Sequence, residues 1–294
     1  MDISCEKLKE NCPIDKSCEW NFLYNSAYNS YNLPIYRCNQ CNLQAYPPKE
    51  ELDLKQLYSE NYYKGTSNYT YKDERETEYY DSYVWDARIK NIRKFQNKGN
   101  FLDVGSSFGG FLSRAKRLGF SPYGVEVSEY AATYCEKRGI PVFKGEFLNS
   151  DYPKEFFTVI TMIEVVEHLS KPDLVFSKCY SLLKEGGMLV IQTANFEGKQ
   201  ALKEGANYHY YLPGHLYYYS LSNLKKFLSY HGFYNFIYYS GVDFPLYAKL
   251  LKSRGSFKQI RDYFKWFKIS YYHFKSTYFP GSTSSMVLYA FKPG

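Results

Sequence analysis

The chain has 294 residues, of which 45% are hydrophobic and 20% aromatic, and its formal net charge is +7. This length exceeds one average domain, the hydrophobic content suffices for a substantial core, and the positive charge favours anionic partners only weakly. We expect a cytoplasmic protein, because no apolar run approaches a transmembrane segment, the N-terminus lacks a signal-peptide pattern, and the seven cysteines do not form the even framework of a small secreted domain.

Residues 1–72 are rich in Cys, Asn, Tyr and Pro and show little period, so we expect an irregular N-terminal module. Cys38 and Cys41 have the two-residue spacing of half a zinc knuckle. Asp15 stands where a second cysteine would complete the other half after Cys12, and Cys18 can replace it. Zinc on these five residues and metal-free packing of reduced thiols both remain open.

The remainder of the chain changes in character. Residues 73–98 predict a linking helix, and residues 99–294 alternate between short apolar strands and amphipathic helices. Strands are predicted at 100–104, 122–126, 141–143, 156–162, 188–193, 233–239 and 285–291, and helices at 109–118, 128–138, 173–183 and 221–231. This order is typical of an α/β fold of Rossmann-like, doubly wound type, with a seven-stranded parallel sheet and a helical insertion at 245–282 before the last strand.

A glycine-containing loop lies where the first of these strands becomes a helix. Gly105 and Gly109 allow a ligand to approach the backbone at the helix N-terminus, with Ser107 between them. Glu126 ends the next strand, where a carboxylate can bind both hydroxyls of a ribose. The loop lacks the order of a dinucleotide fingerprint, and Asp103 would repel a pyrophosphate. The chemistry therefore favours a nucleoside cofactor that carries a cationic amine and a sulfonium.

Two carboxylates and an imidazole follow the fourth strand at Glu164, Glu167 and His168. Three interpretations remain open. Glu167 and His168 could only orient the loop, or His168 could act as a general base, with His215 from the loop after the fifth strand as a second candidate. Alternatively, the two glutamates and His168, with or without His215, could bind magnesium, manganese or zinc.

Four segments together resemble the motifs of class I S-adenosylmethionine-dependent methyltransferases. Residues 102–109 are similar to motif I, 123–128 to the ribose-binding motif, 159–169 to the fourth-strand motif, and 182–191 to the turn before the fifth strand. The resemblance covers roughly residues 80–240, and Ser107 replaces a glycine that many members carry. It implies S-adenosyl-L-methionine as the cofactor, bound by Asp103, Gly105, Ser107, Gly109, Glu126, Val127, Glu146, Phe147, Ile163 and Glu164.

Resemblance also suggests the acceptor. The N-terminal cysteine module and residues 215–233 resemble parts of sugar and polysaccharide-pathway methyltransferases, which implies O-methylation of a sugar or nucleotide-sugar hydroxyl in polysaccharide biosynthesis. His168, His215 and Glu167 would be its catalytic residues. Residues 164–168 are also similar to ubiquinone-pathway and small-RNA 2′-O-methyltransferases, which implies a metal-assisted alternative. A non-catalytic adenosylmethionine-binding protein is the third possibility.

Residues 249–279 contain eight Lys or Arg and a single acid, Asp262, with aromatic residues at helical spacing. The pattern favours a helical lid packed on the core with a solvated basic face. Peripheral contact with anionic lipid, where a lipid-linked sugar would be found, and nucleic-acid binding are its alternatives.

Overall fold

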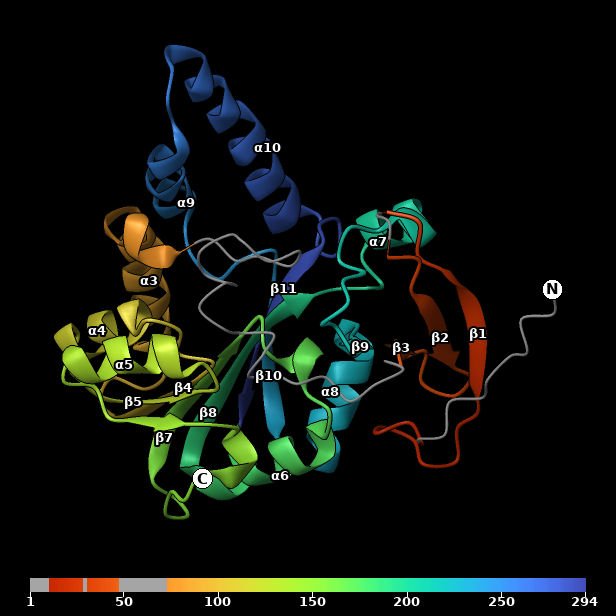
Figure 1. Ribbon diagram of the computed structural model, residues 1–294, viewed down its shortest axis with the longest axis horizontal. Coiled ribbons are helices and arrows are strands. Elements are labelled where there is room, and N and C mark those ends of the chain that lie inside the picture. The colour runs from red at the N-terminus through yellow and green to blue at the C-terminus, as the bar shows by residue number, and fades with distance from the viewer. Residues whose placement is uncertain (1–10, 29–30, 48–72) are drawn as a thin grey trace.

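The computed structural model describes residues 11–28, 31–47 and 73–294, and a seven-stranded sheet lies at its centre (Figure 1). In spatial order the strands are β10 (Tyr234–Ser240), β11 (Ser285–Phe291), β8 (Leu183–Ala194), β7 (Phe157–Ile163), β4 (Gly99–Val104), β5 (Phe120–Glu126) and β6 (Val142–Lys144). The doubly wound α/β fold is confirmed. The expectation of a wholly parallel sheet is wrong, because β11 pairs antiparallel with both β8 and β10.

Helices cover both faces of this sheet (Figure 1). One face carries α3 (Glu78–Ile92), α4 (Gly110–Arg117) and α5 (Glu129–Lys137), and the other carries α6 (Pro172–Leu182) and α8 (Leu221–Tyr230). Local sequence signals set these boundaries: the Ser128 hydroxyl caps α5, and Ser220 forms a capping box with Asn223 at α8. Since both faces are covered, the central strands are largely apolar, as β7 and the buried run Met188–Ile191 of β8 show.

The described part of the N-terminal module, residues 11–28 and 31–47, contains regular strands, which corrects the expectation of an irregular segment there. Strands β1 (Trp20–Asn25), β2 (Pro34–Cys38) and β3 (Gln44–Ala45) form an antiparallel sheet, and β9 (Tyr217–Tyr218) is its fourth strand. Strands of two to six residues are too short to show a recognisable alternation of apolar and polar residues in the sequence. The rest of the module, at 1–10, 29–30 and 48–72, lies outside the described residues.

The insertion before β11 is helical, as predicted, and forms a hairpin of α9 (Leu246–Ser253) and α10 (Lys265–Tyr278) that projects from the body (Figure 1). Ala248 of α9 is buried against Val84 and Ala87 of α3. The predicted packing of the aromatic residues on the core is wrong, because most aromatic side chains of α10 are exposed. No helix in the described part of the chain is long and apolar enough to cross a membrane.

Candidate functional site

The loop between β4 and α4 has a backbone that suits close approach by a ligand. Gly105 and Gly109 have φ angles of +78° and +76°, and Ser107 has +49°, although it carries a side chain. A Cβ on Gly105 would lie 2.8 Å from the Val165 side chain, so only glycine fits here. The Ser107 hydroxyl oxygen is buried without a hydrogen-bond partner in the described structure. This strained cradle therefore retains an unused polar atom, as a ligand site would.

Two buried carboxylates flank the loop. Glu126 accepts hydrogen bonds of 2.8 Å from the backbone N–H groups of Ser107 and Ser128, so it joins the loop to the start of α5. Asp103 accepts a 2.5 Å hydrogen bond from the Thr161 hydroxyl. Burial raises the pKa of Asp103 to about 7 and also raises the pKa of Glu126. The site thus presents two carboxylates that a cation and a pair of hydroxyls could satisfy.

A third carboxylate, Glu74, lies beside the same loop. It was not predicted from the sequence as a site residue. Its Oε1 atom lies 3.4 Å from the position of a Cβ on Gly110, at the N-terminus of α4. Burial and the charge of Asp103 raise the pKa of Glu74 to about 8. Glu74 belongs to a single 3₁₀ turn (Glu74–Glu76) that packs on α3, and the packing of α3 on α4 brings it here.

The remaining predicted cofactor residues lie around this edge of the sheet. Val127 and Ile163 are half-buried, as expected for side chains that border an open site. The Glu146 side chain is exposed, whereas Phe147 is buried in the core on the α6 face. The structure therefore brings Asp103, the loop and Glu126 together, and leaves Glu146 at the surface.

The acidic and histidine residues after β7 gather beside the glycine loop. Glu164 has a φ of +55°, which is strained for a residue with a side chain, and Val165 touches Gly105. Glu167, His168 and His215 each have a potential ligand atom within 4.8 Å of those of the other two. The backbone holds the segment of Glu167 next to the loop of His215, because the Leu216 N–H donates a 2.7 Å hydrogen bond to the Glu167 carbonyl.

Both histidines are held in one tautomer by backbone carbonyls. The Nδ1 atom of His168 lies 2.8 Å from the Gly214 carbonyl, and that of His215 lies 2.8 Å from the Tyr210 carbonyl. Each Nδ1 therefore donates, which leaves Nε2 as the acceptor nitrogen. Burial lowers the pKa of His168 to about 4, and burial together with His168 lowers that of His215 to about 3. Both rings are neutral near pH 7.

A polar network connects this cluster to Arg88 of α3. The Gln192 side chain donates to Glu164 at 2.7 Å and accepts a hydrogen bond from Arg88, which also pairs with Asp243 at 2.8 Å. A cavity of about 420 Å³ lies beyond Asp243, between α3, α9 and α10. The residues that line this cavity do not include the glycine loop, so the cavity is separate from the candidate cofactor site.

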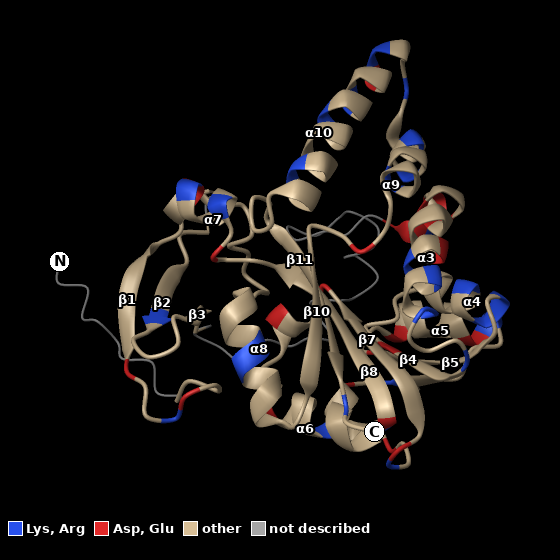
Figure 2. Cartoon of the chain, turned by 180° about the vertical axis from the view of Figure 1, so that it is seen from behind, with Lys and Arg blue, Asp and Glu red and all other residues tan. Residues whose placement is uncertain are grey.

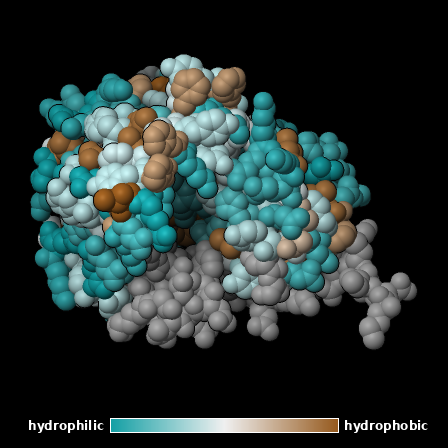
Figure 3. All heavy atoms as spheres, turned by 90° about the horizontal axis from the view of Figure 1, so that it is seen from above, coloured by the Kyte–Doolittle hydropathy of each residue, from teal (hydrophilic) through white to brown (hydrophobic). Residues whose placement is uncertain are grey.

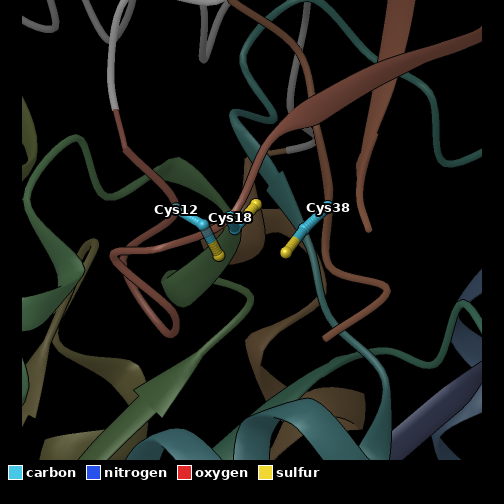
Figure 4. A group of neighbouring side chains, drawn as sticks. All are labelled: Cys12, Cys18 and Cys38. Carbon is cyan, nitrogen blue, oxygen red and sulfur yellow. The ribbon is translucent and has the colours of Figure 1, made fainter. Parts of the chain in front are cut away.

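The four cysteines of the N-terminal module converge, as Figure 4 shows for Cys12, Cys18 and Cys38. The Sγ atoms of these three lie within 4.8 Å of one another, and Cys41 Sγ lies 3.5 Å from Cys12 Sγ. All four are free thiols and buried. A tetrahedral zinc with Zn–S bonds of about 2.3 Å needs sulfur atoms roughly 3.8 Å apart, so the donor set fits zinc.

Asp15 does not join these thiols. Its carboxylate accepts hydrogen bonds from the Ser17 backbone N–H and from the Ser17 hydroxyl, the latter at 2.7 Å, and it lies 3.9 Å from Lys226. The inclusion of Asp15 among the candidate zinc ligands is therefore corrected. Cys18 takes the position that the interrupted spacing left open.

Comparison with known proteins gives a consistent result. A family profile described as "Methyltransferase domain" matches residues 77–236. Ubiquinone biosynthesis O-methyltransferases from Caulobacter sp. (strain K31) and Caulobacter vibrioides are 32% and 34% identical over 141 and 118 residues, which are 41% and 36% of this chain. The matches cover 55% and 46% of those proteins, so the chain spans about half the length of the curated relatives it matches.

Solved structures share the fold at low sequence identity. Phosphoethanolamine N-methyltransferase 2 from Haemonchus contortus, in complex with phosphomonomethylethanolamine and S-adenosylhomocysteine, has a TM-score of 0.57 and 17% identity over 99% of this chain and 71% of that chain. A SAM-dependent methyltransferase from Thermotoga maritima has a TM-score of 0.51 and 19% identity over 75% of this chain and 94% of that one.

Proposed function

The chain belongs to the methyltransferase-domain family as a class I S-adenosylmethionine-dependent methyltransferase, and we propose from this premise that it methylates a hydroxyl oxygen of a small-molecule acceptor. The observation that carries the proposal is the juxtaposition of Glu167, His168 and His215, two neutral imidazoles and a carboxylate, beside the glycine loop. A hydroxyl must lose its proton as it is methylated, and such groups can accept one.

We assign the cofactor contacts on the same geometry. S-adenosylmethionine, when bound, supplies an electrophilic methyl group on a sulfonium. Asp103 would hold the methionyl amine, Glu126 the ribose hydroxyls, and Ser107 would use its unpaired hydroxyl. Val127, Glu146, Phe147, Ile163 and Glu164 remain proposed contacts around the adenosine and the methyl group. Holding both reactants in line contributes about 7–11 kcal/mol when the geometry is favourable.

For the acceptor we propose a sugar or nucleotide-sugar hydroxyl of polysaccharide biosynthesis. Support comes from the sequence resemblance and from the half-buried ring of Tyr210 near His215, which could stack on a sugar ring. The names of the curated relatives favour a quinone-precursor hydroxyl as the second candidate. A labelled-methyl screen with nucleotide sugars, quinone precursors and tRNA tests both. Cofactor binding without turnover of any acceptor would instead indicate a non-catalytic protein.

The pKa of Asp103 leads to a pH dependence of cofactor binding. Because burial raises that pKa to about 7, the apo protein holds a proton below pH 7 that the cationic amine must displace. The affinity should therefore rise about fivefold between pH 6 and pH 7, a range that lies below the α-amino pKa of about 7.7 to 8.0. Titration calorimetry at several pH values measures this.

Two variants separate the carboxylates in this experiment. Asp103→Asn should bind more weakly and lose most of the dependence, whereas Glu74→Gln should remove the part that arises from the raised pKa of Glu74. An unchanged pH profile in Asp103→Asn would refute the assignment of the amine to this residue.

We further propose a structural zinc ion on Cys12, Cys18, Cys38 and Cys41. Metal analysis of reduced, purified protein should find about one zinc per chain, since four clustered thiols match a structural site. Cys38→Ser should lose the metal and lower the melting temperature. The matched control is Cys179→Ala, because Cys179 is also buried but lies on α6 in the main core. Zinc-free wild-type protein, or full zinc content in Cys38→Ser, would contradict the proposal.

A divalent metal on Glu164, Glu167, His168 and His215 is the alternative mechanism. One oxygen of the Glu167 carboxylate has no hydrogen-bond partner, which is compatible with a metal. In that case dialysis against a chelator should abolish turnover, and magnesium or manganese should restore it. The general-base mechanism predicts activity that is indifferent to the chelator while the cysteine site keeps its zinc.

A further inference from the structure

The outer face of α10 carries a continuous aromatic stripe. Its five side chains are spaced alternately by three and four residues, which places them on one face of the helix. Their exposed fractions are 71% for Phe264, 75% for Phe267, 61% for Tyr271, 55% for Phe274 and 66% for Tyr278. The opposite face holds half-buried Trp266 and His273 and buried Ser276. The face of α10 that carries the aromatic stripe therefore points to solvent, away from the body of the protein.

Positive charge surrounds this aromatic stripe. The hairpin segment 249–279 has eight Lys or Arg, and its only acid, Asp262, is paired with Lys265 at 2.8 Å. Figure 2 shows the basic residues distributed along α9 and α10. Figure 3, seen from the end at which the hairpin projects, shows hydrophobic residues at the surface among hydrophilic ones. Lys252 pairs with Asp81 of α3 at 2.9 Å. The hairpin thus combines exposed apolar area with a net positive charge.

We propose that the α9–α10 hairpin docks on an anionic lipid surface, with the aromatic stripe in the interfacial region and Lys258, Lys268 and Lys275 against the headgroups. Aromatic rings are favoured at the level of the headgroups, and lysines near an anionic leaflet add electrostatic attraction. This inference is independent of the acceptor, because it rests on the hairpin alone.

Charge and geometry favour a bilayer over other occupants. A second copy of the chain would bring the same excess of positive charge against itself. A single-stranded nucleic acid binds by stacking its bases on free ring faces, whereas Phe274 and Tyr278 pack on each other with ring centroids 4.4 Å apart. A bilayer requires only one continuous apolar edge flanked by cations.

Vesicle cosedimentation of the full chain tests the proposal. Vesicles of phosphatidylcholine mixed with phosphatidylglycerol should bind the protein, vesicles of phosphatidylcholine alone should bind it about tenfold less, and added salt should weaken binding. The variants Phe264→Ser/Phe267→Ser/Tyr271→Ser and Lys258→Gln/Lys268→Gln/Lys275→Gln should each lose about tenfold or more.

The matched control is Leu202→Ser/Tyr230→Ser, which removes two side chains that are 68% and 61% exposed on α7 (Lys199–Glu204) and α8. It should bind vesicles like the wild type, and all variants should keep the wild-type melting temperature and cofactor affinity. Stripe variants that bind vesicles normally would overturn the proposal. So would a wild-type dimer in sedimentation velocity that the stripe variant dissociates, or tighter binding to RNA than to anionic vesicles.

Discussion

Replacement of Glu126 by alanine is expected to weaken S-adenosylmethionine binding by about 100-fold or more. The carboxylate makes hydrogen bonds to the backbone N–H groups of Ser107 and Ser128, and we propose that it also binds the ribose. Each charge-assisted hydrogen bond contributes about 1.5–3 kcal/mol, so losing the two proposed bonds to the ribose hydroxyls reaches this magnitude. Titration calorimetry of the purified variant measures the loss.

Glu129→Ala is the matched control, because Glu129 is exposed in the first turn of α5, three residues from Glu126. It should bind the cofactor as the wild type does. Glu126→Gln retains one acceptor oxygen and should fall between the two. Wild-type affinity in Glu126→Ala, with an unchanged melting temperature, would show that the cofactor lies elsewhere.

Replacement of His215 by alanine is expected to lower kcat by about 10²- to 10⁴-fold, the range of a lost general base, while cofactor affinity changes little. His168→Ala should show a comparable loss if both rings contribute. Their rings pack edge to face with centroids 4.7 Å apart, so the two losses should not be additive in the double variant. Single-turnover methyl transfer to the identified acceptor measures the chemical step.

His209→Ala serves as the matched control, since His209 lies six residues earlier and its ring contacts Glu204 at 3.3 Å rather than the cluster. It should keep most of the activity. If His209→Ala and His215→Ala lose activity equally, the effect belongs to the loop as a whole and the general-base role is wrong. A loss of cofactor binding in His215→Ala would point to a structural role instead.

The central sheet was predictable because buried apolar runs, glycine turns and a serine cap agree with one another over β4, α4, β5 and α5. The direction of β11 was not, since a strand that returns after a long insertion can run either way. The spacing of the aromatic residues in α10 correctly gave a helix with one aromatic face. Periodicity identifies such a face, but it does not show whether protein or another surface covers it.

The candidate site also contains residues that the sequence predicts and residues that only the packing brings together. Asp103, Gly105 and Glu126 could be grouped from sequence because carboxyl ends of neighbouring parallel strands meet at one edge. Glu74 and Arg88 lie in the segment before β4, and only the packing of that segment on the sheet brings them to the site. Asp15 was misassigned because spacing cannot show that its carboxylate turns to Ser17.

The pairing of β3 with β9, in which Ala45 aligns with Tyr217, has a consequence for synthesis on the ribosome. The two strands are separated by roughly 170 residues, which take about 10 to 30 s to translate. The cysteine module is made early, yet its sheet can close only when the loop that carries His215 has emerged. We therefore expect the sheet of the cysteine module to close well after the cofactor loop between β4 and α4 has been synthesised.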